Sequence, residues 1–213
     1  MTNIQKRILT SLIILPLSIF FIIKGGYLLS FFLLLIFLIG IYELNSVFKK
    51  KNSIIFLSLI LVISLFCIYY LSEVSEYLLF FAISVTISSD IGGYIFGNIF
   101  KWKKLTKISP KKTYSGVLGS YFFSIICLIV WMELFYADLP ISTQTNTFLK
   151  LIIITIIFST IAQIGDLIIS YFKRLDNIKD TGKLLPGHGG IFDRIDGLMF
   201  VLIIATIYYS LNI

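Results

Sequence analysis

The sequence is poor in charged residues, and this scarcity excludes most soluble proteins. Charged side chains make up 14% of the 213 residues, against about 25% in a soluble domain. Hydrophobic residues make up 58%, and the mean hydropathy is +0.97. The chain has too little polar surface for a soluble enzyme, a disordered tail or a secreted domain, so we predict an integral membrane protein.

Cysteine and histidine are also scarce. Cys67 and Cys127 both lie inside apolar runs, so we expect neither a disulfide framework nor a thiolate metal site. His188 is the one histidine, and no usual set of zinc ligands can be assembled with it. The chain also lacks the Gly-x-Ser-x-Gly elbow of many serine hydrolases, so a Ser-His-Asp mechanism is poorly supported.

Apolar residues are gathered into runs that approach the length of a membrane span, about 20 residues. Seven such runs cover residues 8–23, 27–44, 53–71, 77–100, 114–136, 148–172 and 198–211. The predicted fold is all-α, a polytopic membrane helical bundle of about seven transmembrane helices. We expect one integral membrane domain over residues 1–213. No small-residue cleavage site follows the first run, so we expect an uncleaved helix rather than a signal peptide there.

The basic residues predict the orientation of these helices, because lysine and arginine concentrate on the cytoplasmic side of a membrane. Seven spans place 16 of the 18 basic residues on one side, leaving Lys24 and Lys150 on the other. We therefore expect the N-terminus in the cytoplasm. The net charge of +7 then reflects topology, and no nucleic-acid partner is expected.

Two cytoplasmic segments, about 88–119 and 165–197, concentrate the polar chemistry. Each begins with an acid inside an apolar run: Asp90 lies eleven residues before Lys101, and Asp166 lies seven before Lys173. On a helix these separations are roughly 16 and 10 Å. A carboxylate at such depth usually faces a cavity or a partner, so each acid belongs either to a functional site or to a structural ion pair.

The first segment contains six lysines within residues 101–112. They could simply reflect topology and attraction to anionic lipid. Alternatively, Ser109, Lys111, Lys112 and Thr113 stand just before a helix, where ammonium groups, hydroxyls and backbone amides would form a phosphate cradle.

The second segment ends in a glycine-rich stretch around His188. Gly189 and Gly190 allow close approach by a ligand, whereas the alternative is a solvated loop with a structural turn histidine. Asp193 and Asp196 stand three apart and would share a helical face. Such oxygen ligands suit Mg²⁺ with substrate phosphates. Together the two segments indicate chemistry on a polyphosphate at the membrane face, with a membrane-bound attacking group.

Fixed spacing within the second segment carries a family resemblance. Ser170 to Arg174, Lys179 to Gly182 and Pro186 to Asp196 resemble the signature of the phosphatidate cytidylyltransferases, or CDP-diglyceride synthases. The first segment is similar to the family at residues 89–94 and 109–113. The resemblance implies the reaction of CTP with phosphatidic acid to give CDP-diacylglycerol and pyrophosphate.

The resemblance also implies cofactors, partners and residue roles. It implies Mg²⁺ and a possible second cation, contact with membrane lipids, the cell (inner) membrane as location, and an active site facing the cytoplasm; a homodimer would fit the family. The implied catalytic residues are Asp166, Lys173, Arg174, Lys179, Asp180, His188 and Arg194. The implied substrate-binding residues are Asp90, Ser109, Lys111, Lys112, Thr113, Gly189 and Gly190, and the implied metal ligands are Asp166, Asp193 and Asp196.

Two other classes compete with this interpretation. A CTP-dependent lipid kinase would use a similar polar face but would form a phosphomonoester, and the stretch from His188 to Asp196 argues against it. A transporter would line a polar path with Asp90 and Asp166, but would not need so many charges in an extended loop. The Asp-Gly-x-x-Ala-Arg opening of the CDP-alcohol phosphotransferases does not occur.

Overall fold

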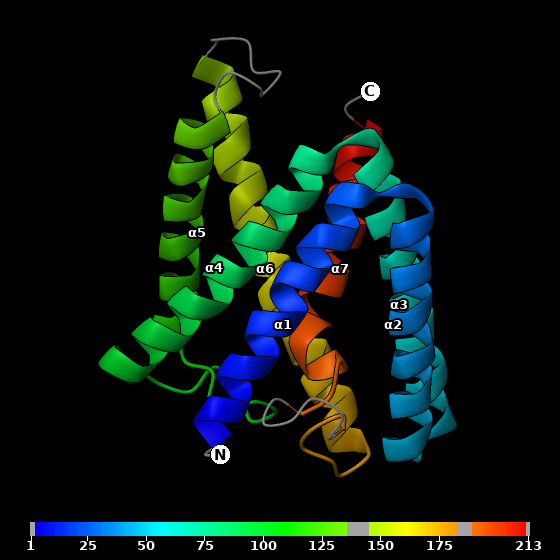
Figure 1. The fold of residues 1–213 in the computed structure, drawn as a ribbon. Coiled ribbons are helices and arrows are strands. Elements are labelled where there is room, and N and C mark those ends of the chain that lie inside the picture. Colours follow the sequence, from blue (N-terminus) through cyan, green and yellow to red (C-terminus); the bar gives the residue numbers. More distant parts are fainter. Residues whose placement is uncertain (1–2, 136–144, 183–188, 212–213) are drawn as a thin grey trace.

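The computed structural model describes residues 3–135, 145–182 and 189–211. These residues form seven helices that alternate in direction along the bundle (Figure 1). The helices are α1 (Asn3–Lys24), α2 (Gly26–Val47), α3 (Lys51–Val74), α4 (Glu76–Phe100), α5 (Tyr114–Phe135), α6 (Thr145–Leu175) and α7 (Phe192–Leu211). A short β-bridge pairs Lys104 with Thr113 in the α4–α5 connection. The predicted helical bundle is confirmed.

Six of these helices are long and apolar enough to cross a membrane, namely α2 to α5, residues 148–175 of α6, and α7. In α1 the apolar stretch found among the described residues is shorter, Ile14–Lys24. Many large apolar side chains on the helices are exposed, for example Phe31 and Phe66, whereas Leu57 and Leu61 are fully buried. Outward-facing apolar residues are expected of a protein whose solvent is lipid.

The N-terminus lies at the same end of the bundle as the α4–α5 and α6–α7 connections, and the C-terminus lies at the opposite end (Figure 1). The α2–α3 connection, with Lys49 and Lys50, is also at the N-terminal end. The structure therefore gathers the basic connections at one end, as the seven predicted spans require. We call this the basic end of the bundle; that it faces the cytoplasm stays a prediction.

Helices α4 and α5 form the closest helix pair, and small residues make this approach possible. A Cβ atom on Gly92 would collide with the backbone carbonyl of Gly119, and a Cβ atom on Gly119 would collide with that of Gly92. Paired small residues let two membrane helices pack backbone to backbone. This packing fixes the lower part of α4, which carries Asp90, against the start of α5.

Helix α6 ends in a turn whose residues hydrogen-bond to the start of α3. Asn177 adopts a left-handed conformation (φ 57°), and the N–H of Ile178 donates to the carbonyl of Lys173 at 2.9 Å, as in a Schellman motif. Just before it, buried Asp176 accepts hydrogen bonds from the backbone N–H groups of Lys49 (3.1 Å) and Lys50 (2.7 Å) and from Ser53 Oγ (2.7 Å). The carboxylate of Asp176 thus caps the N-terminus of α3.

These hydrogen bonds have a predicted effect on stability. Burial alone would raise the pKa of Asp176, but the bonds from Ser53 and the two amides outweigh it and hold the pKa below its usual value. Asp176→Ala should cost about 1–3 kcal/mol at neutral pH, because buried donors lose their acceptor. Since the folded pKa is lowered, this stabilisation is complete above about pH 4 and disappears as the pH falls through the folded pKa.

Thermal unfolding in detergent, repeated over a pH series, measures this difference between wild type and Asp176→Ala. Glu73→Ala is the control, because that carboxylate is exposed at the other end of α3. A difference that persisted unchanged at pH values well below 3 would contradict the assigned role of the carboxylate.

Candidate active site

A polar cavity of about 310 Å³ opens at the basic end between α4, α5 and α6. We call it the aspartate cavity. Its lining includes six residues predicted from the sequence: Asp90, Ser109, Lys111, Lys112, Thr113 and Asp166. Residues separated by as many as 76 positions are thus brought to one place. The structure unites the two segments that the sequence singled out.

An ion pair between Lys112 and Asp166 crosses this cavity. Lys112 Nζ lies 2.6 Å from Asp166 Oδ2 and also donates to the backbone carbonyl of Gln163 at 3.0 Å. The other carboxylate oxygen, Asp166 Oδ1, accepts a hydrogen bond from Ser170 Oγ at 3.3 Å. Lys112 therefore joins the start of α5 to the middle of α6 and partly neutralises the acid there.

Three carboxyl groups from three helices converge beside this ion pair. Asp196 on α7 is a hydrogen-bond partner of Asp166, and it also accepts the N–H of Gly197 at 2.9 Å. Asp90 on α4 interacts electrostatically with Asp166, Lys112 and Arg194. The close fit of α7 against α6 depends on Gly197, where a Cβ atom would lie 2.8 Å from the Ala162 carbonyl oxygen. The result is a cluster of carboxyl oxygen atoms, the ligand type that a divalent cation such as Mg²⁺ prefers.

Asp193, the third predicted metal ligand, makes different contacts from its neighbour Asp196. Its Oδ1 atom accepts from Lys173 Nζ at 2.9 Å, in a buried ion pair. Its Oδ2 atom accepts from the N–H groups of Thr181 (2.8 Å) and Gly190 (3.1 Å). Both oxygens thus bind protein groups, and the carboxylates of Asp193 and Asp196 have separate sets of partners; whether Asp193 binds a metal stays a prediction.

Other residues predicted from the sequence make structural contacts of their own. Arg174 donates to the carbonyls of Ile108 (3.3 Å) and Ile178 (3.0 Å), so it ties the two connections together. Thr113 Oγ1 accepts the N–H of Gly116 at 3.1 Å and caps α5. Gly189 has a positive φ of 88°. His188 lies outside the described residues.

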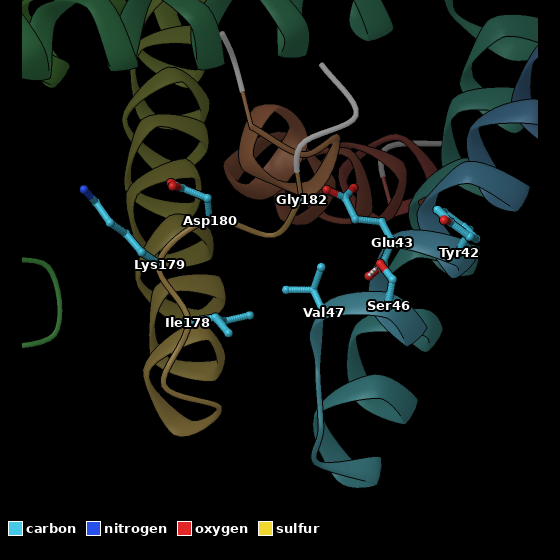
Figure 2. A pocket seen from close by; sticks show the side chains of 8 residues that line it. All are labelled: Tyr42, Glu43, Ser46, Val47, Ile178, Lys179, Asp180 and Gly182. Atoms are coloured by element: carbon cyan, nitrogen blue, oxygen red, sulfur yellow. Dashed lines mark hydrogen bonds between the residues drawn. The ribbon is translucent and has the colours of Figure 1, made fainter. Parts of the chain in front are cut away.

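A second cavity, of about 600 Å³, lies between α2 and the segment that follows α6 (Figure 2). Lys179, Asp180 and Gly182 line it, and so does Glu43, which reaches from α2 toward Gly182 in Figure 2. Glu43 was not among the predicted site residues, because its apolar run was interpreted only as a membrane span. A lone carboxylate in such a run was the available signal.

Whether the residues suit a metal ion depends on the Asp166 and Asp196 carboxyl groups. In the described residues there is no group of three or more His, Cys, Asp or Glu side chains arranged to hold a metal by themselves. Mg²⁺ commonly uses only one or two carboxylates and completes its shell with water and substrate phosphates. The adjacent carboxyl groups of Asp166 and Asp196 fit that requirement.

Comparison with known proteins finds one matching family model and several similar named proteins. The model of the cytidylyltransferase family matches residues 72–212. A protein of Rickettsia conorii named phosphatidate cytidylyltransferase is 32% identical over 212 residues, covering 95% of this chain and 90% of the relative. A protein of Staphylococcus saprophyticus with the same name is 46% identical over 132 residues, covering 62% of this chain. The chain spans about half the length of the staphylococcal relatives it matches, 48% for this one.

The different surroundings of Asp193 and Asp196 predict opposite effects on stability. Asp193→Asn should lower stability by about 2–3 kcal/mol, since it weakens charge-assisted hydrogen bonds to a buried lysine and two amides. Asp196→Asn should leave stability unchanged or raise it, because an asparagine amide can donate to Asp166 without the cost of burying a second ionisable carboxyl group. Thermal unfolding of both variants in detergent, with exposed Asp180→Asn as control, measures the contrast. Equal losses in the two variants would contradict the grouping.

Proposed function

This chain belongs to the cytidylyltransferase family, and we propose that it transfers the cytidylyl group of CTP to phosphatidic acid. The products are CDP-diacylglycerol and pyrophosphate. The observation that carries the proposal is the meeting of Asp90, Lys112 and Asp166 at one cavity within the matched residues 72–212, with Asp196 hydrogen-bonded to Asp166 beside it. The names of the relatives support the lipid substrate.

The reaction needs positioning and charge neutralisation rather than a covalent intermediate. A phosphate oxygen of phosphatidic acid attacks the α-phosphorus of CTP, and the bond to the β-phosphate oxygen breaks to release pyrophosphate. Both substrates are anionic, so bringing them together is costly unless cations lie between them. In the proposal Lys111 and Lys112 bind phosphate oxygens at the aspartate cavity, and Lys173, Arg174, Lys179, His188 and Arg194 bind the remaining negative charge.

Asp166 and Asp196 are the residues that would hold Mg²⁺ in this proposal. Bound there, the ion would supply positive charge that binds phosphate oxygens and withdraws charge from the reacting phosphorus. Lys112 Nζ lies 2.6 Å from Asp166 Oδ2, so in this proposal its ammonium group stands beside the metal-binding carboxylate, where it would bind substrate phosphates. Asp193 in this proposal supports the site through Lys173 and the glycine-rich segment. A second cation stays a prediction.

We further infer that the basic end of the bundle faces the cytoplasm of the cell (inner) membrane. Sixteen of the 18 basic residues lie on that side of the seven spans, as the positive-inside rule requires. CTP is a cytoplasmic metabolite, and the aspartate cavity opens at the basic end of the bundle. The depth of the acids along α4, α6 and α7 would allow a lipid phosphate to reach them without leaving the membrane. Contact with further membrane lipids and a homodimer stay predictions.

The proposal predicts the fate of each phosphate of CTP. The purified protein in detergent, given phosphatidic acid, Mg²⁺ and CTP labelled at the α-phosphate, should place the label in a chloroform-soluble product and release pyrophosphate. Chelation by EDTA should abolish transfer, and added Mg²⁺ should restore it. Asp196→Asn, which removes a proposed ligand, should remain inactive at every Mg²⁺ concentration.

The same assay distinguishes the competing reactions. If label from the γ-phosphate entered an added lipid alcohol while the α-label stayed in water, the protein would be a lipid kinase and the proposal would be wrong. If neither label moved with correctly folded protein, cytidylyl transfer to phosphatidic acid would be excluded.

A further inference from the structure

Glu43 is a buried acid whose carboxylate reaches outside its own helix. It lies one turn before the end of α2, and its side chain is only 1% exposed. Its Oε1 atom accepts a hydrogen bond from Thr181 Oγ1 at 3.0 Å. Its Oε2 atom accepts the backbone N–H groups of Ile191 (2.8 Å) and Phe192 (3.4 Å). All these donors belong to the segment between the end of α6 and the first residue of α7.

Two glycines in that segment make this contact possible. A Cβ atom on Gly190 would overlap Glu43 Oε1, and a Cβ atom on Gly182 would collide with the same oxygen. Figure 2 shows the Glu43 side chain directed at Gly182. Two glycines on the two sides of residues 183–188 therefore meet one carboxylate on a distant helix. The glycines and Glu43 form a single structural unit.

Asp193 binds the same segment through other donors. Its Oδ2 atom accepts the N–H groups of Thr181 and Gly190. Glu43 instead accepts from the Thr181 hydroxyl and from the N–H groups of Ile191 and Phe192. Both ends of the segment are therefore bound between two carboxylates. Glu43 also satisfies N–H groups at the start of α7, which have no partner within their own helix, and its charge is favourable there.

We propose that Glu43 is a positioning residue for the active site. It holds the start of α7, and with it Asp193 and Asp196, in place relative to Asp166 on α6. Neither Glu43 nor its hydrogen-bond partners Thr181, Ile191 and Phe192 line the aspartate cavity, so we infer that Glu43 acts through the segment that it binds. This inference rests on the proposed cytidylyl transfer, but its structural part can be tested without activity.

The contacts of Glu43 predict which substitutions the protein tolerates. A glutamine carbonyl can accept the two amides, and its NH₂ group can donate to Thr181 Oγ1, so Glu43→Gln can keep the arrangement. Leucine is similar in size but offers no acceptor, so Glu43→Leu leaves buried donors without a partner. A residue that acted through its charge would lose its function equally in both variants.

The experiment compares Glu43→Gln and Glu43→Leu by hydrogen exchange of residues 189–196 and by the kcat and KM of lipid cytidylylation. Glu43→Leu should raise exchange at the start of α7 and lower kcat/KM by about 100-fold, the loss that a displacement near 1 Å can cause. Glu43→Gln should keep the protection and stay within about fivefold of wild type, the cost of about one weakened hydrogen bond.

Asp176→Ala is the matched control, because Asp176 also binds two backbone amides and one hydroxyl but at the start of α3, and alanine removes that acceptor. It should lower thermal stability without raising exchange at residues 189–196. If wild type shows no lipid cytidylylation, the proposed function fails, and the exchange measurements still test the positioning role.

Two results would overturn the proposal. Unchanged exchange and activity in Glu43→Leu would show that the carboxylate positions nothing. Equal loss of activity in both variants with full protection at residues 189–196 would show that Glu43 acts by its charge. Should Glu43→Leu fail to fold, Thr181→Val removes one donor alone. It should raise exchange locally and lower kcat/KM by about fivefold, and no change in either would contradict the proposal.

Discussion

A carboxylate inside a membrane bundle must be met by N–H donors, hydroxyl groups or cations, because no bulk water is available to solvate it. This requirement organises the basic end of the molecule. Glu43, Asp176 and Asp193 meet it within the protein, each with at least three hydrogen bonds from amides, hydroxyls or a lysine. Glu43 and Asp176 each join segments more than 120 positions apart in the sequence, and Asp193 joins the start of α7 to the end of α6 and the segment that follows it.

Asp90, Asp166 and Asp196 satisfy the same requirement less completely. Lys112, Ser170 and the amide of Gly197 donate to the Asp166–Asp196 pair, and the ionised forms of Asp90, Asp166 and Asp196 repel one another. A site with this excess of negative charge favours binding of a cation. The contrast separates acids that stabilise the fold from acids that are available for chemistry, although all six lie at one end of the bundle.

The sequence was sufficient to predict the features that depend on local pattern. Apolar runs predicted the helices, and the positions of Lys24 and Lys150 predicted which ends carry few basic residues. The spacing from Asp90 to Lys112 and from Asp166 to Asp196 predicted two polar segments, and the structure brings them to one cavity. Each of these inferences needs only the chain's own periodicity and charge.

Features that depend on contacts between distant segments were not predictable in this way. The spacing of Asp193 and Asp196 placed them on one face, but hydrogen bonds to Thr181 and Gly190 give Asp193 a separate environment. Glu43 was missed because hydropathy treats α2 as a uniform membrane span. Its partners Thr181 and Ile191 are 138 and 148 positions away, so nothing near Glu43 in the sequence marks them.

Gly182 and Gly190 belong both to a local sequence pattern and to a contact between distant segments. Gly182 and Gly190 stand in a stretch whose composition suggests a loop open to a ligand. In the structure their missing side chains make room for the Glu43 carboxylate. A glycine-rich signature can thus reflect the need of a buried acid for close backbone contact as well as the need of a substrate. In the proposed enzyme the two needs are linked, because the segment that Glu43 binds leads directly into the helix that carries Asp196.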